Sequence, residues 1–282
     1  MLAEWSPKLA KNLLVSFAIS TSVYVITYIL TYTIAYLPIP IFANFNEITS
    51  QFSLQGVNWT GGHSNWNLGN VFLSYGIGPT INLVIAGVSL IIFNVYRKQK
   101  GLPKWFLLWL GIHGINRFFG GLGLGSLMEH GFYYFISWLM MPSFITYLII
   151  GISMVAMFAI SLLLTLPMLR TSFSNTLTKP KHRIKYLVSA YLLPWLFGFI
   201  ITNIMFSNCE VGFECYALHE TLIQLFILIL IVPSLFSQSI VRYTIKLPRD
   251  DSVIRWMVFG VGLMILFIIL FSLGLHNTFT LN

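Results

Sequence analysis

Charged side chains are scarce in this 282-residue chain: Asp, Glu, Lys and Arg make up 9% of it, whereas 57% of its residues are hydrophobic. A soluble globular domain carries about 25% charged residues. So little charge cannot cover the surface of a soluble protein of this length, and the apolar surplus needs lipid as its solvent. The composition therefore predicts a membrane protein.

Lysine and arginine are absent from most of the chain. Fifteen of the 16 lie in four short segments, each beside a long apolar run. They are Lys8 and Lys11; Arg97, Lys98, Lys100 and Lys104; Arg170, Lys179, Lys181, Arg183 and Lys185; and Arg242, Lys246, Arg249 and Arg255. The positive-inside rule places all four in the cytoplasm, with 170–185 and 242–255 as basic cytoplasmic loops. The net charge of +8 thus reports topology, and no nucleic-acid partner is expected.

Seven apolar runs are long enough to cross a ~30 Å hydrocarbon core, which takes about 20 helical residues. They are Leu13–Ala35, Val71–Tyr96, Trp105–Leu127, Pro142–Leu169, Tyr186–Phe206, Tyr216–Ile240 and Trp256–Leu275. If the N-terminus is cytoplasmic and each run crosses the membrane once, every basic segment lies on the cytoplasmic side. We therefore predict an all-α membrane bundle of about seven transmembrane helices, with the N-terminus in and the C-terminus out.

The remaining segments fit one transmembrane domain over residues 1–282. The polar stretch 37–69, rich in Asn, Ser and Gly, is expected to be an extracytoplasmic loop. Residues Phe132–Met141, followed by Pro142, are expected to form a short interfacial or re-entrant helix, because the alternation allows one crossing there. The first apolar run has no cleavage site after it and reads as an anchor. The expected location is the plasma membrane or a cell inner membrane.

Cysteine is nearly absent too. The two cysteines, Cys209 and Cys215, lie in a predicted outer loop with Glu210 and Glu214. Paired thiols outside the cytoplasm are usually oxidised, and two ligands alone do not complete a zinc shell. We expect a small disulfide loop here, with a metal site as the alternative.

Polar residues within the spans are candidate sites, because a charge there costs roughly 2.5–3.5 kcal/mol on insertion scales. The third run contains His113, Asn116 and Arg117 at i, i+3 and i+4, which places them on one helical face. Arg117 is the single basic residue outside the basic segments, and it needs an anion. Glu220, with Gln224 one turn deeper, enters the sixth run from the outer side.

Two interpretations of this polar set remain open. One is an ion pair of Arg117 with Glu220 or Glu129 that ties helices together. The other is a metal or proton site built from imidazoles and carboxylates on the outer side. The candidate zinc ligands are His63, His130, His219 and Glu129. The chain contains neither H-E-x-x-H nor H-x-x-x-H spacing.

The second run contains Gly78-Pro79-Thr80-Ile81-Asn82, followed by Leu83-Val84-Ile85-Ala86. This resembles the G-P-x-x-N-L-x-x-A helix of the site-2 protease family of intramembrane zinc metalloproteases. The resemblance implies that Asn82 lies close to an active site. However, Leu13–Ala35 contains no His, Glu or Asp, so the H-E-x-x-H of the family is missing. Its Asp-Gly zinc-ligand motif is missing as well, which implies a catalytically silent relative.

The sequence therefore favours a non-catalytic scaffold or regulatory membrane protein without a cofactor, in contact with the lipid bilayer and a membrane-protein partner. One alternative is a small-solute or proton-coupled transporter that uses Arg117, Glu220 and His113 around a cavity. The other is a seven-helix metal-dependent hydrolase. A closed apolar bundle with an isolated ion pair would favour the scaffold.

Overall fold

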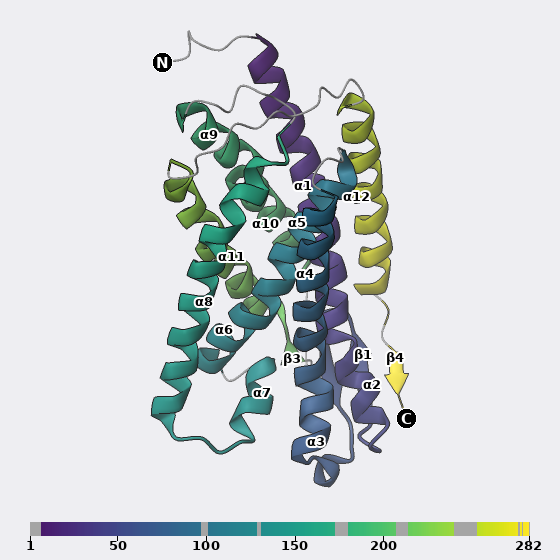
Figure 1. The fold of residues 1–282 in the computed structure, drawn as a ribbon. Helices are drawn as coiled ribbons and strands as arrows, with labels where there is room; N and C mark the ends of the chain where they lie inside the picture. The colour runs from purple at the N-terminus through teal and green to yellow at the C-terminus, as the bar shows by residue number, and fades with distance from the viewer. Residues whose placement is uncertain are drawn as a thin grey trace.

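The structure is a computed structural model that describes residues 7–96, 101–128, 131–172, 180–206, 214–239, 253–275, 277 and 279–281. Long helices lie side by side along one direction, and a small sheet lies at one end of the bundle (Figure 1). Six helical stretches among these residues are long and apolar enough to cross a membrane. The chain is therefore a polytopic membrane protein with a helical bundle fold.

The six stretches follow the predicted apolar runs closely. They are α1 (Pro7–Tyr36) with α2 (Pro38–Asn44); α3 (Leu68–Val71), η2 (Phe72–Gly76) and α4 (Ile77–Val95); α8 (Ser143–Leu169); α9 (Pro180–Leu187), η5 (Val188–Leu192) and α10 (Leu193–Met205); α11 (Ala217–Ser237); and α12 (Val253–Leu275). A further stretch runs along the bundle beside them (Figure 1). It consists of α5 (Leu102–Ile115), the π-helical turn η3 (Asn116–Gly120) and α6 (Gly121–Met128).

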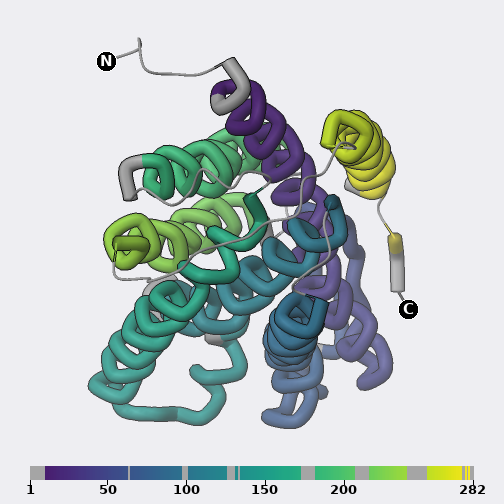
Figure 2. The backbone as a smooth tube through the Cα atoms, turned by 45° about the horizontal axis from the view of Figure 1, so that its top comes forward, coloured from purple at the N-terminus to yellow at the C-terminus, as the bar shows by residue number. Residues whose placement is uncertain are grey.

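Helix α1 lies at the centre of the bundle and α12 at its edge (Figure 2). The apolar window of α1 is 78% buried, whereas that of α12 is 11% buried. The outer face of α12 exposes large apolar side chains such as Val258, Phe259 and Leu270. A continuous apolar face of this kind is unfavourable in water, so the outer face of α12 is suited to contact with lipid.

Helix α4 packs against α1 and α5 at two glycines. A Cβ atom on Gly78 would lie 2.3 Å from the backbone oxygen of Ala35, and one on Gly114 would lie 2.4 Å from that of Asn82. Only a residue without a side chain lets the helices approach so closely. The glycine of the Gly-Pro in the second run, Gly78, therefore has a packing role in this fold.

A short helix and a proline separate α6 from α8, as expected for Phe132–Met141. Helix α7 spans Phe132–Ser137, and Pro142 directly precedes the first residue of α8. Figure 1 shows α7 at the end of the bundle where α3 and the sheet lie. Its place at a membrane interface stays a prediction.

The stretch 37–69 is more structured than the loop that we predicted. It contains α2, the strands β1 (Ser50–Ser53) and β2 (Gly56–Trp59), and a 3₁₀ turn, η1 (His63–Asn65). Strands β3 (Glu214–Cys215) and β4 (Phe279–Leu281) complete an antiparallel sheet of order β3-β2-β1-β4. Three distant parts of the chain thus satisfy one another's backbone hydrogen bonds at this end.

Candidate functional site

Four tyrosines of α1 form a buried column through the middle of the bundle. Tyr24, Tyr28, Tyr32 and Tyr36 follow one another every fourth residue, so they lie on one helical face. None is more than 4% exposed. Their ring centroids are 6.5, 6.1 and 4.7 Å apart in that order. We call these four residues the tyrosine column.

Arg117 and Glu220 form a buried ion pair beside this column. Arg117 comes from η3 and Glu220 from the first turn of α11, and Arg117 Nη1 donates a hydrogen bond to Glu220 Oε1. The two side chains are 3% and 1% exposed. The guanidinium carbon lies 5.0 and 5.3 Å from the ring centroids of Tyr28 and Tyr32. The cation is therefore held by both a carboxylate and aromatic faces.

The carboxylate of Glu220 also accepts hydrogen bonds from the column. Tyr28 Oη donates to Oε2 over 2.8 Å, and Tyr36 Oη donates to Oε1 over 2.6 Å. Together with Arg117, three donors from two other elements converge on one buried carboxylate. Such charge-assisted bonds offset the cost of removing both charges from water.

His219 adds a further side chain to this network. Its Nδ1 lies 2.9 Å from Tyr36 Oη. Because Tyr36 gives its single proton to Glu220, the hydrogen bond with His219 requires Nδ1 to be the donor, which assigns the tautomer. The backbone of Gly131, with φ of +60°, presses against the ring; a Cβ there would lie 2.8 Å from Cε1 of His219.

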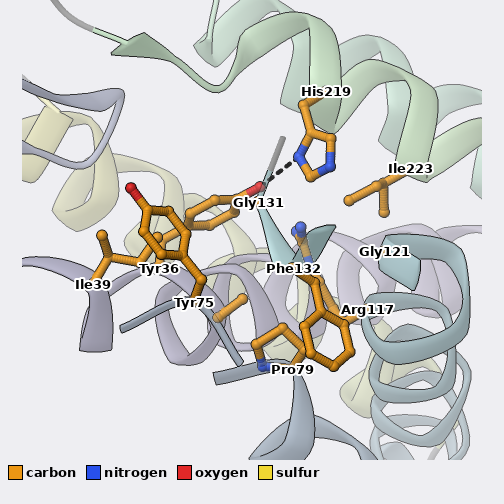
Figure 3. A pocket seen from close by; sticks show the side chains of 11 residues that line it. Tyr36, Ile39, Tyr75, Pro79, Arg117, Gly121, Gly131, Phe132, His219 and Ile223 are labelled. Atoms are coloured by element: carbon orange, nitrogen blue, oxygen red, sulfur yellow. Dashed lines mark hydrogen bonds between the residues drawn. The ribbon is translucent and has the colours of Figure 1, made fainter. Parts of the chain in front are cut away.

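A small cavity of about 20 Å³ adjoins Arg117, His219 and Tyr36 (Figure 3). The guanidinium and the imidazole both face it, and Phe132 and Tyr75 are among the residues that close it. Arg117 Nη2 has no hydrogen-bond partner among the described residues. A space of this size holds about one water molecule.

The other polar residues of the third and sixth runs contact neighbouring helices. Asn116 Nδ2 donates to the backbone oxygen of Ile223 over 2.8 Å. Gln224 Oε1 accepts from Tyr24 Oη over 3.1 Å and from Thr202 Oγ1 over 2.8 Å. Both side chains thereby fix α11 against other helices.

His113 lies away from the cavity. Its ring packs edge-on against Tyr24, with a centroid distance of 4.6 Å, and it is not among the residues that line the cavity. The transport hypothesis requires one cavity that joins Arg117, Glu220 and His113. The cavity beside the pair does not join them.

Asn82 ties α4 to α1 at another point. Its Nδ2 donates to the backbone oxygens of Thr31, over 3.0 Å, and of Gly78, over 3.2 Å. It is fully buried and does not line the cavity at Arg117.

The predicted zinc ligands fall largely outside the described part of the chain. Glu129 and His130 lie outside it, and only the backbone of His63 is described, in η1. His219 bonds to Tyr36. Among the described residues no three His, Cys, Asp or Glu side chains come together as a metal site. The zinc site stays a prediction.

The predicted disulfide, like the zinc site, falls largely outside the described part of the chain. Cys209 lies outside the described residues, and Cys215 is described only by its backbone, as part of β3. Its pairing with Cys209 stays a prediction.

The tyrosine column was not predicted from the sequence, although the sequence contains a signal for it. Tyrosine recurs every fourth residue from Tyr24 to Tyr36, that is, through the second half of the first apolar run and one residue past its end. A hydropathy profile counts these residues as part of the span and does not show the spacing of their hydroxyl groups. A polar periodicity of four within a span is the sign that could have revealed them.

Comparisons of this chain with protein-family models, with curated proteins and with solved structures found no match.

Proposed function

We propose that this chain is a non-catalytic membrane protein of scaffold or regulatory type. The observation that supports this best is the Arg117–Glu220 pair, which is enclosed by the tyrosine column and bordered by a cavity of about 20 Å³. A substrate needs far more room, since ligand sites measure about 300–1,000 Å³. The polar core therefore suits the fixing of helices better than the handling of a solute.

We further propose seven crossings, with the N-terminus in the cytoplasm and the C-terminus outside. The stretch α5–η3–α6 supplies the seventh. The described basic residues support this orientation: Arg183 and Lys185 lie in α9 and Arg255 lies in the first turn of α12. In Figure 1 these helix ends lie at the same end of the bundle, opposite the sheet. The expected membrane is the plasma membrane or a cell inner membrane.

The sheet, α2 and α7 form the outer end of the proposed arrangement, and we propose that this end docks a membrane-protein or extracytoplasmic partner. Main-chain pairing of three chain segments makes it a defined surface, and Phe45 and Phe279 are 77% and 54% exposed there. Exposed aromatic side chains are frequent anchors in protein interfaces.

The test compares single variants of the pair with a matched surface variant. Glu220→Gln leaves Arg117 buried without a counter-charge, and breaking a buried pair in this way costs about 3–5 kcal/mol. We expect Glu220→Gln and Arg117→Leu to reduce the yield of folded protein and its melting temperature. Arg255→Leu removes an exposed cation from α12 and should change neither.

A proton-coupled transporter is the second candidate, and it is favoured by the buried Arg117 Nη2, which has no hydrogen-bond partner among the described residues. Wild-type protein in vesicles that contain a pH-sensitive dye separates the two. The scaffold predicts no more proton flux than in empty vesicles. Proton flux that vanishes in a Glu220→Gln variant with normal folding would overturn the scaffold in favour of transport.

The remaining hypotheses keep narrower support. Kinship with the site-2 proteases rests on Gly78 to Asn82, where the close packing of α4 accounts for the glycine. A zinc-dependent hydrolase rests on His63, Glu129 and His130, and elemental analysis of the purified protein for bound zinc tests it directly.

A further inference from the structure

An apolar groove of about 570 Å³ lies between α1 and the η5–α10 stretch, at the end of the bundle where the described basic residues gather. Leu14 and Phe17 form one wall, and Leu193 and Phe197 form the other. Lys185 and Ser189 are the polar members of its lining. The volume falls within the ~300–1,000 Å³ range of ligand sites.

The two walls are fixed to each other. Ser189 Oγ donates a hydrogen bond to the backbone oxygen of Leu13 over 3.0 Å. Deeper along the groove, the rings of Phe17 and Phe197 meet edge to face, with centroids 5.2 Å apart. The groove is therefore part of the fold and needs no rearrangement to accept a ligand.

The groove nevertheless remains open to the surroundings of the bundle. Leu14 is 65% exposed, and Phe197 is 48% exposed. These apolar side chains offer a long hydrocarbon surface that no described part of the chain covers.

The length and polarity of the groove point to a single leaflet of the bilayer. Both walls run from the basic end inward, and the helical rise from Lys185 to Phe197 is about 18 Å at ~1.5 Å per residue. Half of a ~30 Å hydrocarbon core is ~15 Å. The groove thus begins with a cation, and its apolar part extends about as deep as one leaflet.

The positive charge of the groove lies at its entrance. Lys185 lines that end, and Lys11 is exposed on α1 one turn before Leu14. A partner transmembrane helix would contact the bundle along its whole length and would gain little from cations at one end. An anionic headgroup on an acyl chain matches both features.

We propose that this groove binds one anionic phospholipid, whose acyl chain lies between Leu14, Phe17, Leu193 and Phe197 and whose phosphate contacts Lys185. The proposal relies on the proposed orientation only for the choice of the cytoplasmic leaflet. It adds a specific lipid ligand to the general contact with the bilayer.

The test uses the purified full chain in detergent with added phosphatidylglycerol or phosphatidylcholine. Native mass spectrometry counts bound lipid, and thermal unfolding reports stabilisation. We expect retention of phosphatidylglycerol over phosphatidylcholine, and a loss of about fivefold in its affinity for Lys185→Gln, as for one basic contact to an anionic lipid. Arg255→Gln, which removes an exposed cation elsewhere at the same end, should bind like the wild type.

A second pair of variants tests whether the apolar part of the groove holds the acyl chain. Leu14→Trp fills the groove and should reduce lipid retention while Lys185 is intact. Val258→Trp adds the same ring to an equally exposed position on α12 and should not. Equal retention of both lipids, or equal losses in Lys185→Gln and Arg255→Gln, would refute the site.

Occupation of the groove by a second copy of the chain is the remaining outcome. A dimer that disappears in Leu14→Trp but is insensitive to phosphatidylglycerol would overturn the lipid assignment. All of these readouts use folded protein without any partner, so their failure is distinguishable from failure of the scaffold proposal.

Discussion

At the scale of single residues, the tyrosines of α1 combine a hydrogen bond to an anion with a ring contact to a cation. Tyr28 and Tyr36 each donate a hydroxyl proton to Glu220, and their rings lie within 5.9 Å of the Arg117 guanidinium carbon. One side chain type thus supports both partners of the ion pair. A phenylalanine would keep the contact to the cation and lose the contact to the anion, so the two contributions can be measured separately.

Removal of the Tyr28 hydroxyl should destabilise the protein more than removal of the Tyr24 hydroxyl. Tyr28→Phe loses a hydrogen bond to a carboxylate, worth about 1.5–3 kcal/mol, and Tyr24→Phe loses one to the neutral amide of Gln224, worth about 0.5–1.5 kcal/mol. Both variants keep the ring. Chemical denaturation in detergent measures the difference, and equal losses would mean that the charge of Glu220 does not strengthen its bond to Tyr28.

Lys104 provides a pH-dependent contribution just before the predicted third span. Burial, with a smaller effect from the charge of Arg170, lowers the pKa of Lys104 from its ordinary value of 10.5 to about 8. Its ammonium lies 5.5 Å from the ring centroid of Phe93. Between these two pKa values the unfolded chain holds the proton more tightly, so stability should rise as the pH rises through this window.

The comparison of wild type with Lys104→Met tests this sign. The wild type should gain stability between pH 8 and 10.5, and the variant, which carries no titrating group there, should show a smaller gain. The measurement is the free energy of unfolding at a series of pH values. Parallel profiles for the two proteins would assign the pH dependence to other groups.

At the scale of elements, the sequence predicted the long helices well and the sheet not at all. Apolar runs report spans directly, because lipid demands length and hydrophobicity from each helix separately. Strands β3 and β4 are two and three residues long, too short for any alternation to be visible. Their pairing with 50–59 depends on how the helices bring distant segments together, which no local pattern contains.

The candidate site was likewise predictable only in part. Arg117 and Glu220 stood out because charges within spans are rare and need partners. The position of His113, against Tyr24 and away from the cavity, depends on how α5 rotates relative to α1. The π-helical turn that carries Arg117 also changes helical phase, and its presence has no sequence signature here.

The contact of α4 with α1 leaves no room for a side chain at Gly78. Gly78→Ala would place a Cβ against the backbone of Ala35, which cannot move aside cheaply, so we expect a loss of about 1–3 kcal/mol. Gly87 lies on the same helix, and a Cβ added there would meet nothing within 4 Å, so Gly87→Ala should be neutral or stabilise by up to ~1 kcal/mol. Melting temperatures of the two variants measure this, and similar behaviour of both would contradict the close approach.

At the scale of the whole molecule, the two ends of the bundle differ in kind. Within the described residues, the helix ends that carry lysine and arginine lie toward one end of the bundle, and the sheet covers the other. The tyrosine column connects the membrane core to that sheet, because Tyr32 Oη donates to the backbone oxygen of Leu54 in the β1–β2 turn. One continuous set of contacts therefore links the sheet to the buried pair.

The orientation of the bundle can be tested with an amine-reactive reagent that does not cross membranes. The segments assigned to the outside, 37–69, 207–215 and the tail from residue 276, contain no lysine. Intact cells should therefore leave the wild-type protein unlabelled, and permeabilised cells should label it. Ser64→Lys, at an exposed position in η1, adds one outer amine and should be labelled in intact cells. Labelling of Lys11 or Lys185 from outside, with no additional signal from Ser64→Lys, would mean that the sheet end is the side shielded from the reagent. The orientation would then be reversed, and so would the leaflet assigned to the lipid groove.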